Sequence, residues 1–249
     1  MSYGLYMAAE GAQVQSKILE VLSNNLANVD TAGFKRDLAI AQARNSEAIE
    51  RGLDSPGSGS INDIGGGVMV SQTATQFSSG PLKSTGIPTD MAIVGEGFYQ
   101  IEKDGDKFLT RAGNFLLDVD GQLVTQEGHN VLSDGGSPIR LDTTQPWTVK
   151  EDGTIDQNGP IAKVGLFRPK SLGDLVKVGS TMFSSLSTPE AVPTEERNVR
   201  GGFLELSGVK PTEEMMELIK ASRAFEVNVQ MIRSQDGMMG NLISRVLGK

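Results

Sequence analysis

Residues 23 to 36 decide the fold, and they read Ser-Asn-Asn-Leu-Ala-Asn-Val-Asp-Thr-Ala-Gly-Phe-Lys-Arg. Asn24, Asn25 and Asn28 stand where residues that tolerate the left-handed region commonly end a helix. Gly33 follows within a turn sequence and is free to take a positive φ, and Phe34 comes directly after it. We therefore predict that an N-terminal helix ends near residue 28 and that these five residues form the turn that redirects the chain.

The residues before this turn have the periodicity of an amphipathic helix. Mostly apolar side chains recur at alternating spacings of three and four, which places them on one face of a helix. The stripe consists of Leu5, Ala8, Ala12, Gln15, Leu19, Leu22 and Leu26. A single helix cannot bury such a stripe by itself, so we expect it to pack against another surface.

The C-terminal segment repeats this alternation over more turns. Its stripe consists of Met215, Leu218, Ser222, Phe225, Val229, Ile232, Asp236, Met239, Ile243 and Val246. Pro211 suits the first turn of a helix and Thr212 can cap it, so we place the helix start there. The pattern is that of a coiled-coil seam with two polar breaks. Periodicity does not distinguish a helix pair inside one monomer from contacts between subunits, and both remain open.

The segment between the two helices has two parts that differ in amino-acid composition. Residues 34–89 are rich in Gly, Ser, Thr and Asn, which favours a flexible connecting segment with a short helical continuation, a loop and then extended stretches such as 68–77. Residues 90–206 alternate short apolar runs with Asp-Gly turns, which predicts a compact β-rich domain. With assembly helices at 1–33 and 207–249, we predict an α+β fold with a central all-β domain.

The sequence offers no constellation for catalysis. The chain contains no cysteine and a single histidine, His129, which excludes cysteine nucleophiles and cysteine-bound metals. Two Asp-rich stretches, 118–121 and 151–156, lack the ligand spacing of a calcium loop and are more simply hairpin turns. Gly95-Glu96-Gly97 precedes another strand instead of the helix that a phosphate loop requires. We therefore predict no catalytic residue, no cofactor and no metal site.

Net charge and hydropathy limit the kinds of partner that we expect for this chain. The formal net charge is −8, from 23 basic and 31 acidic residues, and no basic cluster is interleaved with aromatic residues. Nucleic acid is therefore not expected as a partner. No run of about 18 apolar residues and no secretory leader pattern is present, so we expect no membrane insertion and no cleaved signal peptide.

Four motifs in order resemble those of the flagellar rod and hook family. Residues 23–28 with 31–36 resemble the N-terminal "SNN-[LI]-AN…T-x-GFK" run of that family. Residues 90–99 resemble "D-x-A-I-x-G-x-GFF", and residues 110–115 with 120–125 resemble "TR-x-G-x-F…D-x-x-G-x-LVT". The tail at 223–228, Arg-Ala-Phe-Glu-Val-Asn, resembles "RA-[YF]-E-x-N". The four matches span nearly the whole chain.

The resemblance implies a structural subunit of the bacterial flagellar basal-body rod, without enzymatic activity. The chain length points to a rod component of the FlgF or FlgG type. Residues 202–211 are similar to the proximal-rod FlgF pattern "G-x-LE-x-SNVKP", although Gly208 replaces its Asn, whereas the glycine-rich stretch before Asp90 is closer to distal-rod FlgG. We favour the FlgF type and keep the FlgG type as the alternative.

The resemblance also implies assembly partners and an export route for the subunit. Rod subunits polymerise with themselves and with other rod and hook-family proteins as axial neighbours, and they are exported unfolded by the flagellar type III export apparatus. The location would be the periplasm-spanning rod of the basal body. As interface residues we predict one set of apolar side chains from the two stripes. The set is Leu5, Leu19, Leu22, Leu26, Met215, Leu218, Phe225, Val229, Ile232, Met239 and Ile243.

Two other classes of function compete with this interpretation. A secreted binding module on a coiled-coil stalk would account for the periodicity and the β domain, and would form stable trimers at low concentration. A β-rich hydrolase would need a cleft with a raised carboxyl pKa, and no residue pattern indicates one. We rank the binding module second and the hydrolase third.

Overall fold

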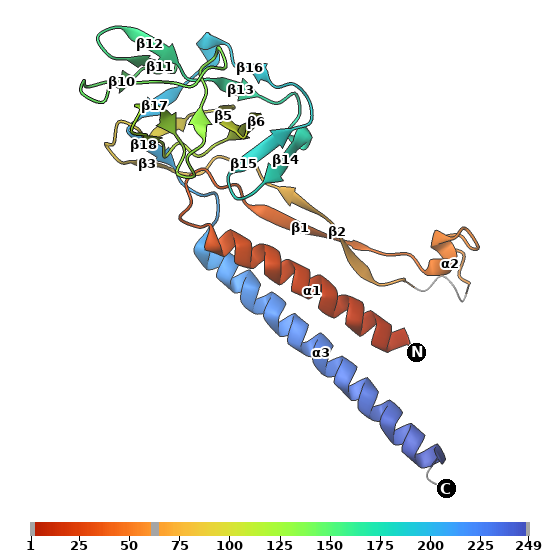
Figure 1. Cartoon of the computed structure of the whole chain (residues 1–249). Helices are drawn as coiled ribbons and strands as arrows, with labels where there is room; N and C mark the ends of the chain where they lie inside the picture. Colours follow the sequence, from red (N-terminus) through yellow and green to blue (C-terminus); the bar gives the residue numbers. More distant parts are fainter. Residues whose placement is uncertain (1–2, 61–64, 248–249) are drawn as a thin grey trace. The chain divides into compact units, whose positions relative to one another are not determined.

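The computed structural model describes residues 3–60 and 65–247, and it confirms the α+β class (Figure 1). Two long helices, α1 (Tyr3–Ala27) and α3 (Pro211–Leu247), come from the two ends of the chain, and short strands make up most of what lies between them. By its internal contacts the chain divides into two units. The helical unit contains residues up to 27, 37–75 and from 210 onward, and the β unit contains residues 28–36 and 76–209.

The helical unit pairs α1 and α3 in opposite directions. Gly4 lies against the side chain of Gln235, and Gly11 lies against that of Asn228. A step of seven residues along α1 therefore matches a step of seven back along α3, which is the spacing expected for two helices in continuous contact. Because α3 has 37 residues and α1 has 25, the last turns of α3 extend beyond the start of α1.

A β-hairpin completes the helical unit. Strands β1 (Asp37–Ala43) and β2 (Val68–Thr75) pair antiparallel with a bulge between Ile40 and Ala41, and both strands contact α1. The short helix α2 (Glu47–Glu50) lies between them in the sequence. We expected a helical continuation at the start of segment 34–89, but residues 37–43 are extended instead, because they bond to a second strand across the hairpin.

The β unit consists of short antiparallel strands and two turns of 3₁₀ helix. Its largest sheet has nine strands. The elements are β3 (Leu82–Ser84), β4 (Met91–Ile93), β5 (Phe98–Lys103), β6 (Asp106–Thr110), β7 (Leu116–Leu117), β8 (Leu123–Val124), β9 (Asn130–Val131), β10 (Thr148–Val149), β11 (Thr154–Asp156), β12 (Pro160–Lys163), β13 (Leu166–Arg168), η1 (Leu172–Asp174), β14 (Leu175–Val178), β15 (Met182–Ser185), β16 (Glu190–Ala191), η2 (Thr194–Glu196), β17 (Val199–Gly201) and β18 (Phe203–Glu205).

The predicted Asp-Gly turns close hairpins in this unit. Between β5 and β6, both Asp104 (φ 55°) and Gly105 (φ 89°) take positive φ, which is the geometry of the two-residue turn that matches the twist of paired strands. The strands bury two apolar clusters, and in the larger one Tyr99 packs edge-on against Phe115 with ring centroids 5.1 Å apart. Trp147 packs against the same core, so the only tryptophan of the chain lies in the β unit.

Candidate assembly interface

The predicted seam residues of α1 lie on the side of the helix that is covered by the rest of the helical unit. Leu22 is buried, and Leu5, Leu19 and Leu26 are half-buried. The predicted residues of α3 divide into two groups. Leu218, Phe225, Val229 and Ile232 are half-buried, whereas Met215, Met239 and Ile243 are exposed. In a single chain, part of the predicted stripe therefore stays open.

The face of α3 turned toward α1 includes polar residues that the sequence did not single out. Glu214 is buried and accepts a hydrogen bond from Asn25, and Ala221 is buried one position before the predicted Ser222. Asn228 and Gln235 lie against Gly11 and Gly4. Because glycine has no Cβ, Gly4 and Gly11 leave room between the helices for these two amide side chains. This pairing becomes visible only once the register of the two helices is known.

A second face of α3 is apolar and exposed. Successive members of this row are three, four, seven or eight residues apart, so neighbouring side chains lie close together along the helix surface. They are Met216, Ile219, Val227, Met231, Met238 and Leu242, and each is between 51% and 61% exposed. An isolated apolar side chain on a surface is ordinary, but a row of six along one helix marks an interaction surface.

Asn25 fixes the end of α1 within the helical unit. Its side chain is fully buried. The Nδ2 atom donates to the carbonyl oxygen of Asp37 at 2.8 Å, and the Oδ1 atom accepts from the backbone N–H of Asp37 at 2.9 Å. Nδ2 also lies 3.4 Å from Oε2 of Glu214. One amide group thus joins α1, β1 and α3, which explains why an asparagine stands at this position.

Of the other predicted turn residues, Asn24 lies within α1, and Asn28, Gly33 and Phe34 belong to the β unit. Thr31 donates from its hydroxyl to the side-chain oxygen of Asn28 at 3.2 Å. Gly33 takes φ 68°, and a Cβ atom there would overlap the backbone of Arg111 and Ala112. Phe34 is fully buried, with the ammonium group of Lys177 4.0 Å from its ring centroid. The turn is therefore held by close backbone contact as well as by its own sequence.

The residue after Phe34 reaches a buried carboxylate. Lys35 Nζ lies 2.7 Å from Oε1 of Glu205, and Arg111 Nε lies 2.6 Å from Oε2 of the same residue. None of the three side chains is more than 4% exposed. Gly80 also donates its backbone N–H to Glu205, at 2.9 Å. Three motifs that are far apart in the sequence, 31–36, 110–115 and 202–211, therefore meet at one side chain.

The remaining donors of this cluster are satisfied by backbone oxygens. Arg111 donates to the carbonyl groups of Ile93, Gly95 and Gly97, and Lys35 donates to that of Ser78 at 2.9 Å. Burial lowers the pKa of Lys35, although Glu205 opposes this effect. Burial alone would raise the pKa of Glu205, but the two cations outweigh it and hold the pKa below its usual value.

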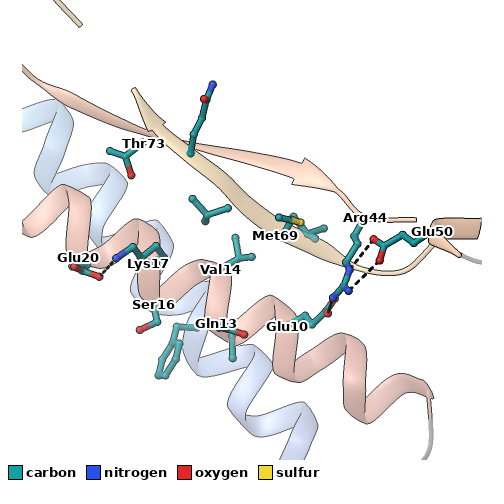
Figure 2. Close-up of a pocket in the computed structure, with 15 residues that line it drawn as sticks. Glu10, Gln13, Val14, Ser16, Lys17, Glu20, Arg44, Glu50, Met69 and Thr73 are labelled. Atoms are coloured by element: carbon teal, nitrogen blue, oxygen red, sulfur yellow. Dashed lines mark hydrogen bonds and ion pairs between the residues drawn. The ribbon is translucent and has the colours of Figure 1, made fainter. Parts of the chain in front are cut away.

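A groove of about 970 Å³ lies in the helical unit between α1 and the β1–β2 hairpin (Figure 2). Apolar side chains from both walls line it, including Val14 of α1 and Val68 and Met69 of β2. Its charged residues are paired with one another. Arg44 binds Glu50 at 3.0 Å and Glu10 at 3.5 Å, and Lys17 binds Glu20 at 2.7 Å.

Within residues 3–60 and 65–247, no group of three or more His, Cys, Asp or Glu side chains is arranged to hold a metal ion. Over the same residues, no helix is both long enough and apolar enough to cross a membrane. The features that stand out in this part of the chain are the helix faces, the turn and the groove.

Three family models match separate parts of the chain. Residues 5–35 match a model described as flagella basal body rod protein. Residues 92–157 match the flagellar hook protein FlgE/F/G D1 domain, and residues 200–245 match the flagellar basal body rod FlgEFG protein C-terminal model. The first and third models cover most of α1 and most of α3, and the second covers part of the β unit.

Curated relatives match over nearly their full length. The chain is 32% identical to a flagellar basal-body rod protein FlgF of Caulobacter vibrioides, covering 100% of this chain and 99% of the relative. It is 31% identical to a flagellar basal-body rod protein FlgG of Bacillus subtilis, with 98% and 99% covered. A FlgG of Borreliella burgdorferi is 33% identical, with 96% and 97% covered.

One solved structure also matches in part. It is the crystal structure of the Helicobacter pylori flagellar hook protein FlgE2, which is 27% identical to this chain. The matched region covers 43% of this chain and 21% of the FlgE2 chain. The TM-score of 0.19 is too low for the two folds to be compared.

Proposed function

The chain belongs to the flagellar basal-body rod protein family, and on that premise we propose that it is a proximal-rod subunit of the FlgF type that polymerises through α1 and α3. Members of this family are structural proteins of the flagellum and not enzymes. Polymerisation through heterologous contacts that do not close into a ring produces a helical tube. Each added subunit would become part of a shaft that transmits torque.

This proposal is supported chiefly by α3, which packs against α1 and also exposes a row of large apolar side chains. One side of α3 is covered by α1, and a row of large apolar side chains from Met216 to Leu242 remains exposed. A side chain of this size contributes about 1.5 to 3 kcal/mol when it is fully buried, so covering the row would supply a large driving force for assembly. We further propose that α1 and α3 pack as a coiled coil in the assembled rod.

The FlgF assignment rests on the segment that leads into α3. Val209 is buried, Lys210 follows it, and Pro211 begins the helix, which agrees with the "VKP" element of the FlgF pattern. Overall identity does not favour either type, because the FlgF and FlgG relatives lie at 32% and at 31% to 33%. The FlgG type is therefore the second candidate, and it predicts a distal position in the rod.

We propose that axial neighbours include further copies of this chain and other rod and hook-family proteins. The subunit would reach the periplasm-spanning part of the basal body through the flagellar type III export apparatus. The absence of cysteine supports passage as an unfolded chain, since no disulfide can form on the way.

The test is a strain that lacks this gene, examined for swimming and for basal-body structure by electron microscopy. The strain is complemented with the full chain or with a version that lacks residues 1–28. We expect that the null strain builds no complete rod and that only the full chain restores it. A rod that stops at its first segment indicates the proximal position, and one that stops later indicates the distal position.

Normal flagella in the null strain would contradict the rod proposal. The binding module on a coiled-coil stalk would then become the leading hypothesis, and stable trimers of the purified chain at low concentration would support it. Restoration of swimming by the version without residues 1–28 would leave a rod role but contradict polymerisation through α1.

A further inference from the structure

The α1–hairpin groove, defined by the residues that line the space between α1 and the β1–β2 hairpin, has an open apolar surface. Val68 and Met69 are 41% and 45% exposed on its hairpin wall. Val14 is buried on the wall formed by α1 and points toward β2 (Figure 2). The charged residues at the rim are already paired among themselves, through Arg44 with Glu50 and through Lys17 with Glu20. An occupant of this groove should therefore be apolar and free of charge.

The chain itself contains one segment of that kind. Residues 237–244 of α3 read Gly-Met-Met-Gly-Asn-Leu-Ile-Ser and carry no charged side chain. Four large apolar residues lie within two turns, and all of them are between 45% and 60% exposed. They are Met238, Met239, Leu242 and Ile243. We call residues 237–244 the α3 overhang, because they lie beyond Gln235, which faces Gly4 close to the start of α1.

We propose that the α3 overhang of one subunit docks into the α1–hairpin groove of a second copy of this chain. The proposal rests on the proposed rod function and specifies one contact between neighbouring subunits. The lengths are similar, because the groove follows α1 from Glu10 to Glu20, about 15 Å of helix, and the eight residues of the α3 overhang span about 12 Å. The methionines on both sides suit a contact between flexible apolar surfaces.

The contact has to join different molecules. The groove lies beside the middle of α1, whereas the α3 overhang extends away from the start of α1, so a straight helix cannot return to its own groove. Groove and overhang are different surfaces, which makes the contact heterologous and allows it to repeat from one subunit to the next. The same contact would bury apolar area from both subunits, including Met69 and Met239.

The experiment uses the absence of native cysteine. Two full-length versions are expressed together in the null strain, one with Thr73→Cys in the groove and one with Met239→Cys in the α3 overhang. Basal bodies are isolated and treated with a short bismaleimide crosslinker. The matched control replaces Thr73→Cys with Thr212→Cys, an exposed threonine in the same unit that does not line the groove. Each single version alone is a second control.

We expect a covalent dimer only from the pair Thr73→Cys and Met239→Cys, and its loss when Ile243→Asp is added to the overhang. The proposal is overturned if assembled rods give no dimer, if the Thr212→Cys control gives equal yield, or if the adduct contains a different protein. Rods that assemble without this dimer would leave the proposed function intact. If the native chain, which contains no cysteine, fails to restore rods in the null strain, the proposed function itself is contradicted.

Discussion

The ammonium nitrogen of Lys35 lies 2.7 Å from a carboxylate oxygen of Glu205, a residue 170 positions away in the sequence. Both side chains are almost completely buried, and Arg111 binds the other carboxylate oxygen. The motif that ends with Lys35 is therefore anchored in the β unit by an ion pair as well as by the contacts of Gly33 and Phe34. A buried group of two cations and one anion depends on the anion, because Glu205 is the counter-charge for both cations.

Glu205→Gln should destabilise the β unit by about 3 to 5 kcal/mol, because it leaves two buried cations without their counter-charge. Urea unfolding followed by the fluorescence of Trp147 measures this, since that residue packs against the β core. Glu127→Gln removes an exposed carboxylate of the same unit and should change the free energy of unfolding by less than about 0.5 kcal/mol. Equal effects of the two substitutions would contradict the role of Glu205.

The stability of the β unit should depend on pH through Glu205. Its pKa in the folded chain lies below the usual value of 4.5, so the ionised carboxylate stabilises the fold at every pH above about 4.5. This contribution is lost as the pH falls through the folded pKa, because the unfolded chain then binds more protons. We expect the difference in unfolding free energy between the native chain and Glu205→Gln to shrink below pH 4.5. A difference that stays constant down to pH 2 would refute this dependence.

Gly33→Ala should unfold the β unit at lower urea concentration than Gly86→Ala. Both glycines have nearly the same positive φ, 68° and 70°, so both substitutions carry the left-handed cost of about 1 to 2 kcal/mol. At Gly86 no atom lies within 4 Å of the added Cβ, whereas at Gly33 the backbone of Arg111 is in the way. The difference between the two variants isolates the steric contact, and equal midpoints would show that the contact is absent.

Asn25→Asp should loosen the end of α1. The new carboxylate cannot donate to the Asp37 carbonyl, and it faces the carboxylate of Glu214. An unmet buried hydrogen bond costs about 1 to 3 kcal/mol, and a negative charge at a helix C-terminus adds to this. Hydrogen exchange of the Asp37 amide should accelerate roughly 10- to 100-fold. Ser23→Asp adds the same charge at an exposed site and should leave that amide unchanged.

Leu22→Asp should abolish swimming while leaving the β unit folded. Leu22 is buried in the helical unit, and an unpaired charge there costs several kcal/mol. Swimming on soft agar and Trp147-detected unfolding measure the two effects separately. A Leu22→Asp strain that swims normally would exclude this residue from the assembly seam.

Met231→Asp tests the second face of α3. Met231 is 54% exposed, so the substitution should change the stability of the single chain by less than about 0.5 kcal/mol. If neighbouring subunits cover that face, the same substitution buries a charge in the rod and swimming is lost. Met231→Leu keeps the apolar surface and should swim. Retained swimming of Met231→Asp would show that this face stays open in the rod.

Sequence patterns predicted those elements whose formation depends on residues close together in the chain. The end of the first helix, the start of α3 at Pro211 and the hairpin turn at Asp104 and Gly105 follow from backbone preferences of the residues at those positions. The start of segment 34–89 was predicted less well. Its strand β1 depends on pairing with β2, whose partner residues lie about 30 positions away, and composition alone does not reveal such a pairing.

The sequence by itself determined the α+β class, the two amphipathic helices and the family, because periodicity, turn residues and motif order are properties of short stretches read in order. Only the tertiary structure decided that Lys35, Arg111 and Glu205 form one cluster, that Asn25 binds the backbone of Asp37, and which residues of α3 face α1. Those relationships depend on helix register and on contacts between distant segments. They are fixed by the packing of the whole chain and not by the preferences of any one stretch.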